Sequence, residues 1–171
     1  MTNGQSFTLW SIRIATAFYV ASLALYLARG NRRWEGACRL AWTAGCILYL
    51  AHVWGAFQFF HGWSHVAAYR ETAHRTGELF NIEWGGGLYF NYLFSLVWLA
   101  DTVWLWRSFE TYHHRPSWVG SAIHSFLAFM FFNATVIFAS GLSRWLAVAA
   151  TMGLLLLWLR ARTIGLSKTI E

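Results

Sequence analysis

Residues 86–106 read GGLYFNYLFSLVWLADTVWLW, and this stretch decides the fold. A helix that crosses the hydrocarbon core of a bilayer needs about 20 mainly apolar residues. The stretch has that length, and Asp101 is its one Asp, Glu, Lys or Arg residue. We therefore predict that it is a membrane-spanning helix.

The composition of the whole chain agrees with this prediction. Of the 171 residues, 57% are hydrophobic and 12% are charged, whereas soluble domains average about 45–50% apolar and about 25% charged residues. These values exclude a water-soluble globule, and the 19% of aromatic residues excludes a disordered chain. The 13 Lys and Arg residues form no continuous basic face, which argues against a nucleic-acid-binding protein. Cys38 and Cys46 fit neither a disulfide framework nor a zinc site, so we interpret them as packing residues.

Four further apolar stretches complete the expected architecture. The last of them spans a bilayer only if it borrows Leu142 and if Arg160 and Arg162 extend to the interface. We predict an all-α integral membrane bundle of about five transmembrane helices, formed by residues 1–171 as a single domain. The predicted helices cover residues 7–28, 40–60, 86–106, 118–139 and 145–159.

The basic residues predict the orientation. Nine of the 13 fall in three segments that an odd number of helices places on one side of the membrane. Cytoplasmic segments carry the excess of Lys and Arg, so the N-terminus is expected outside and the C-terminus in the cytoplasm, in a multi-pass protein of a bacterial inner membrane. The nine residues are Arg29, Arg32, Arg33, Arg39, Arg107, Arg115, Arg160, Arg162 and Lys168.

The long outer loop, residues 61–85, concentrates ionisable side chains. If 62–77 is helical and lies along the interface, His61 and His65 share one face, and Glu71, His74 and Glu78 share nearly the opposite face. Imidazole nitrogens and carboxylate oxygens suit Zn, Cu or Fe. Joining the two groups into one transition-metal site requires a break in the helix, which Gly62 or Gly77 could provide. The alternative is an amphipathic surface segment with solvated side chains.

A run of glycines follows this loop at residues 85–87. Backbone N–H groups at the start of a helix favour anions, so a carboxylate, phosphate or lipid headgroup is one expected ligand. The alternative, which we favour, is a hinge that turns the loop into the membrane.

Ionisable and amide side chains inside the spans are further candidates, because they are costly in a bilayer. Asp101 and His124 lie at similar depth, about 7–9 Å from the cytoplasmic side at about 1.5 Å per residue, and are candidates for a buried pair. Arg13, His52, Asn91 and Asn133 are expected to form a polar layer in the outer half. A haem between His52 and His124 is disfavoured because their depths differ.

The sequence predicts no specific reaction. Our leading hypothesis is a transition-metal site on the outer loop, used for redox or hydrolytic chemistry with a loop carboxylate as base. The alternative is a non-catalytic subunit or assembly partner of a larger membrane complex, and a proton or ion conductor through Asp101, His124 and His52 is a third hypothesis. The expected partners are the lipid bilayer and other membrane subunits, with no nucleic acid.

Overall fold

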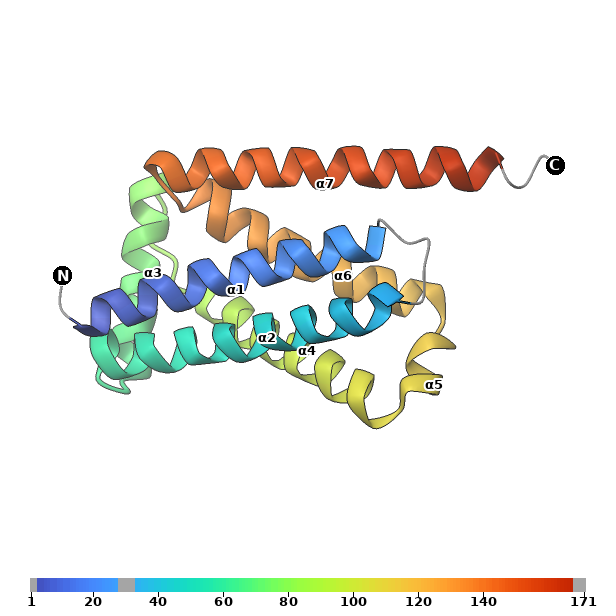
Figure 1. The fold of residues 1–171 in the computed structure, drawn as a ribbon. Coiled ribbons are helices and arrows are strands. Elements are labelled where there is room, and N and C mark those ends of the chain that lie inside the picture. Colours follow the sequence, from blue (N-terminus) through green and yellow to red (C-terminus); the bar gives the residue numbers. More distant parts are fainter. Residues whose placement is uncertain (1–2, 28–32, 168–171) are drawn as a thin grey trace.

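The computed structural model describes residues 3–27 and 33–167, and this part of the chain is helical with no strand. Figure 1 shows the long helices gathered in a bundle, with the last one lying along its side. In chain order the elements are α1 (Asn3–Leu27), α2 (Arg33–Ala56), η1 (Phe57–His61), α3 (His65–Phe80), α4 (Gly87–Arg107), α5 (Phe109–His113), α6 (Ser117–Phe132), η2 (Asn133–Ile137) and α7 (Gly141–Ser167). The two η elements are single π-helical turns.

Five of these helices are long and apolar enough to cross a membrane. They are α1, α2 with η1, α4, α6 with η2, and α7, and each overlaps one of the five predicted stretches. The prediction of an all-α fold with five such helices is therefore confirmed. The last helix is longer than expected and continues to Ser167. Three of the nine basic residues that predict the orientation, Arg29, Arg32 and Lys168, lie outside the described residues.

Small residues let α1 and α2 approach closely. A Cβ atom added to Gly45 would lie 3.0 Å from the Trp98 ring and 3.4 Å from the Ala15 carbonyl oxygen. One added to Gly55 would lie 3.0 Å from both Phe7 and Thr8. Contacts of this kind are what small residues permit between membrane helices.

The core is a cluster of aromatic rings at the centre of the bundle. Trp98 of α4 is fully buried, and its ring centre lies 5.5 Å from that of Trp42 on α2 and 5.8 Å from that of Tyr19 on α1. Phe131 of α6 lies 5.5 Å from Trp98 and stacks on Tyr19 at 3.9 Å. One tryptophan thus contacts residues from three other helices.

The helix α3 runs across one end of the bundle of long helices (Figure 1). It begins where the Ser64 side chain accepts a hydrogen bond from the Ala67 N–H, which is a standard helix N-cap. It packs closely against the residues before α4, because a Cβ added to Gly85 would lie 2.5 Å from the Tyr69 carbonyl oxygen. Gly85 therefore has a packing role.

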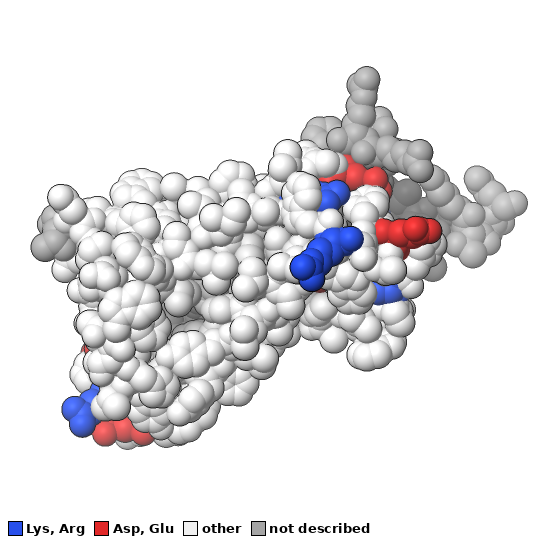
Figure 2. Space-filling view, turned by 90° about the horizontal axis from the view of Figure 1, so that it is seen from below, with Lys and Arg blue, Asp and Glu red and all other residues white. Residues whose placement is uncertain are grey.

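Charged side chains gather at the two ends of the molecule. Figure 2 shows Lys, Arg, Asp and Glu at both ends of one face, with an uncharged surface between them. This distribution is compatible with a multi-pass membrane protein, because ionisable groups are costly in the hydrocarbon region. One charged end carries α3, and the other carries α5 and the start of α6.

Candidate functional site

The break in the outer loop lies at Gly62 and Trp63, and both residues have left-handed backbone conformations, with φ of 53° and 60°. His61 therefore ends η1, and His65 begins α3. The expectation that these two histidines share one helical face is wrong, because the helix begins at His65 and not at Gly62. His65 Nδ1 instead lies 3.0 Å from the Tyr92 hydroxyl of α4.

The other predicted loop ligands lie on one exposed face of α3. His74 Nδ1 is 3.7 Å from Glu78 Oε1, and Arg75 Nε donates to Glu71 Oε1 at 3.0 Å. Arg75 also lies 3.7 Å from Glu78. More than half of each of these side chains is exposed. In residues 3–27 and 33–167, no group of three or more His, Cys, Asp or Glu side chains could hold a metal ion.

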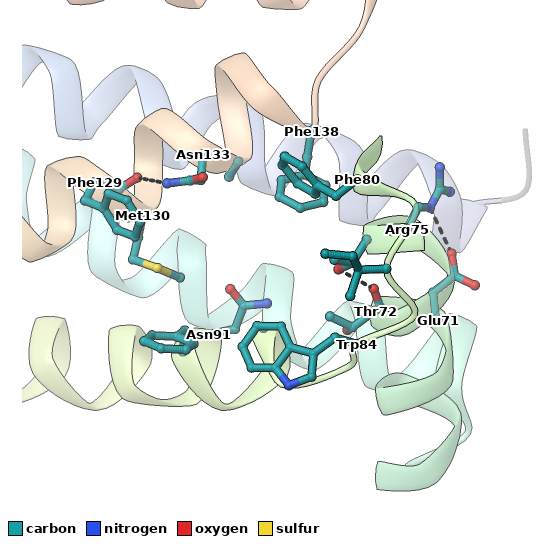
Figure 3. Close-up of a pocket in the computed structure, with 15 residues that line it drawn as sticks. Glu71, Thr72, Arg75, Phe80, Trp84, Asn91, Phe129, Met130, Asn133 and Phe138 are labelled. Carbon is teal, nitrogen blue, oxygen red and sulfur yellow. Dashed lines mark hydrogen bonds and ion pairs between the residues drawn. The ribbon is translucent and has the colours of Figure 1, made fainter. Parts of the chain in front are cut away.

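An open cavity lies between α4 and α6, and α3 closes it at one end (Figure 3). Its volume is about 930 Å³, at the upper end of the range of about 300–1,000 Å³ for small-molecule sites. Its walls are mainly aromatic and aliphatic. They include Phe80, Trp84, Phe90, Phe129, Met130 and Phe138.

The polar groups of the cavity form two levels. At one end, the cavity is lined by side chains of α3, namely Glu71, Thr72, Arg75 and Thr76. The side chains of Asn91 and Asn133 line it deeper between the helices, on opposite walls (Figure 3). Two of the polar residues predicted inside the spans therefore line the same cavity, Asn91 from α4 and Asn133 from the π-helical turn η2. Such turns occur frequently at functional sites.

The other two members of the predicted outer polar layer do not line this cavity. His52 Nδ1 lies 2.8 Å from the Thr8 carbonyl oxygen of α1. Arg13 is exposed, and its guanidinium lies 5.3 Å from the centre of the Trp10 ring. Arg13 thus has the surroundings of a surface residue, whereas His52 ties α2 to α1.

At the opposite end of the bundle, the carboxylate of Asp101 is completely buried. Arg115 donates from Nη1 to Oδ1 at 2.6 Å, and Tyr112 donates from its hydroxyl to Oδ2 at 3.0 Å. The Arg115 guanidinium also lies 3.9 Å from the centre of the Tyr112 ring. Burial, and then the Asp101 charge, raises the pKa of Tyr112, so this phenol stays protonated and donates to the carboxylate.

The sequence placed Arg115 only in the cytoplasmic segment and proposed His124 as the partner of Asp101. His124 lies among aromatic rings, 5.2 Å from Trp42 and 5.9 Å from Tyr26. A signal for the observed pair was present in the sequence, because Asp101 and Arg115 are both near one end of adjacent helices. The short helix α5 brings the chain back beneath α4 and places Arg115 at the carboxylate.

Comparison with known proteins adds no functional information to this geometry. No protein-family model, curated protein or solved structure matches the chain.

Proposed function

We propose that this protein binds one amphipathic molecule in the cavity between α3, α4 and α6. The apolar part of that molecule would lie along the aromatic walls, with its polar part among the threonine, asparagine and charged side chains. The observation that supports this proposal is the cavity itself, which has ligand-sized volume, mainly apolar walls and a few polar groups. That combination is characteristic of small-molecule sites.

Binding fits the cavity better than catalysis. The titratable side chains that line it are Glu71 and Arg75, and these two residues are paired with one another at 3.0 Å. A general base or an activated nucleophile needs a free group within hydrogen-bond reach of its substrate. The hydroxyls of Thr72 and Thr76 both donate to backbone carbonyls of α3, so neither is activated by a neighbouring base.

The proposal includes an orientation in the membrane. Arg107 and Arg115 lie at the end of the bundle opposite α3, and the positive-inside rule assigns this end to the cytoplasm. The cavity then opens in the outer half of the bilayer, with the N-terminus outside. An amphipathic ligand would reach it from the outer leaflet of a bacterial inner membrane.

Filling the cavity tests the proposal. Ala134 lines the cavity, whereas Ala128, on the same helical arm, is exposed and does not line it. We expect Ala134→Trp to lower the affinity for bound amphipathic molecules roughly tenfold, a loss of about 1.4 kcal/mol, because the indole ring occupies space that the ligand would fill. Native mass spectrometry of protein purified in mild detergent counts these molecules. Ala128→Trp is the control, and equal occupancy in the two variants would contradict the proposal.

Metal binding by the outer loop is a separate proposal with a smaller donor set than the sequence predicted. His74 and Glu78 lie 3.7 Å apart and are exposed, so a transition metal held by them would complete its coordination with water. Elemental analysis of the purified protein tests this. Metal in stoichiometric amount that is lost in His74→Ala would support it, and equal metal content in both proteins would refute it.

A further inference from the structure

The groups in the cavity that can still form hydrogen bonds with a ligand are the side-chain amides of Asn91 and Asn133, and not the paired charged side chains of α3. Asn133 Nδ2 donates to the Phe129 carbonyl oxygen at 2.8 Å, which leaves its Oδ1 as an acceptor. The side-chain amide of Asn91 makes no hydrogen bond within the described part of the chain, whereas its backbone oxygen accepts from the hydroxyls of Tyr49 and Ser95. Figure 3 shows the two amides on opposite walls, with Met130 beside them.

The charged groups at the other end are already paired. Arg75 is 3.0 Å from Glu71 and 3.7 Å from Glu78, so its guanidinium has two carboxylates around it. A charged headgroup would have to displace one of these ion pairs before it gained a partner.

Resting on the proposed function, we infer that the ligand is an uncharged lipid-like molecule with one group that both donates and accepts hydrogen bonds, a hydroxyl or an amide. Asn91 offers N–H donors, and Asn133 offers a carbonyl oxygen acceptor. In apolar surroundings an unpaired polar group is costly, so a ligand group that pairs with these amides is favoured over one that cannot. The apolar walls take the hydrocarbon part of the same molecule.

Matched probes test the inference. Hexadecanol and its methyl ether have the same chain, but only the alcohol donates a hydrogen bond. Palmitate and hexadecylamine supply the two charged headgroups. We expect the wild-type protein to bind the alcohol roughly 3- to 10-fold more tightly than the ether, the ratio that one neutral hydrogen bond provides. The charged probes should bind more weakly than the alcohol. Competition in nonionic detergent micelles, read by native mass spectrometry, measures all four affinities.

Variants assign the difference to the amides. In Asn133→Leu, which removes the acceptor, binding of the alcohol should fall to the level of the ether, while binding of the ether stays as in the wild type and reports an intact cavity. In Asn91→Leu, which removes the N–H donors, both probes should bind more weakly, because the oxygen of each accepts from that amide, and the alcohol should keep its preference. Ser95→Ala, one turn along α4 and outside the cavity lining, should keep the preference.

Two results separate failure of the inference from failure of the proposed function. Equal binding of alcohol and ether to the wild type, or tighter binding of a charged probe, would overturn the inference and leave the cavity as a binding site. If no probe binds the wild type better than it binds Ala134→Trp, the proposed function fails as well.

Discussion

Replacing Arg115 by methionine should lower the free energy of unfolding by about 3–5 kcal/mol, which is the usual cost of breaking a buried ion pair from one side. The Asp101 carboxylate is fully buried, and Arg115, which donates to it at 2.6 Å, is 10% exposed. Methionine preserves much of the side-chain volume but removes the positive charge. Among the described residues, the hydrogen bond from Tyr112 then remains to the carboxylate. Unfolding in mixed micelles with increasing SDS measures the loss.

A double variant shows whether the charge itself is responsible. Adding Asp101→Asn to Arg115→Met removes the buried charge while an amide oxygen still accepts from Tyr112. We expect this second change to restore most of the lost stability, because replacing both members of a buried pair by neutral groups is far less costly than removing one. If the two substitutions are additive, the ion pair does not hold this end of the bundle together.

An exposed ion pair gives the matched control. Arg75 contacts Glu71 at 3.0 Å, but about two thirds of its side chain is exposed, compared with one tenth for Arg115. Exposed pairs contribute about 0–1 kcal/mol. Arg75→Met should therefore change the free energy of unfolding far less than Arg115→Met, although both variants lose a guanidinium that donates to a carboxylate.

The five long helices could be predicted from the sequence because a bilayer imposes a length and an apolar composition on each span. The end of α7 could not, because hydropathy marks where apolar residues stop and not where the helix ends. Arg160 lies beyond the predicted stretch, yet the helix continues through it to Ser167. Leu and Arg are both good helix formers, so the helix extends past the apolar run.

Depth along each helix does not identify the partner of Asp101, because it leaves out how the connecting segment folds. That estimate placed His124 near Asp101 and left Arg115 in a connecting segment. The segment between α4 and α6 folds into the short helix α5 and returns to the bundle. Contacts made by such a reversal depend on tertiary packing, and hydropathy carries no information about them.

The turn at residues 62–63 of the outer loop is hard to predict from the sequence for a different reason. If the helix began at Gly62, His61 and His65 would lie on one helical face. The sequence also indicates Gly62 as a position where the helix can break. Trp63 also adopts a left-handed backbone conformation, which is uncommon for a bulky residue. Its ring stacks on Phe57, and its Nε1 donates to Gln58 at 3.0 Å. These contacts with η1 stabilise a turn that the local sequence does not specify.

Replacing Trp98 by alanine should lower the free energy of unfolding by about 3–5 kcal/mol, the usual cost of truncating a buried aromatic residue. Its ring is fully buried and contacts rings from α1, α2 and α6. Packing rather than water exclusion holds membrane helices together, so the void affects all three interfaces. Trp118→Ala is the control, since that side chain is 71% exposed and its loss should change the stability little.

Gly45 provides the sharper test of the same contact. A Cβ atom at this position would lie 3.0 Å from the Trp98 ring and 3.4 Å from the Ala15 carbonyl oxygen. Gly45→Ala alone should therefore cost about 1–3 kcal/mol through overpacking. In the Trp98→Ala background the nearest of these atoms is gone, so the same methyl group should cost much less or partly fill the void. An equal cost in both backgrounds would mean that α2 and α4 do not meet at Trp98, because substitutions at residues in contact are expected to be non-additive.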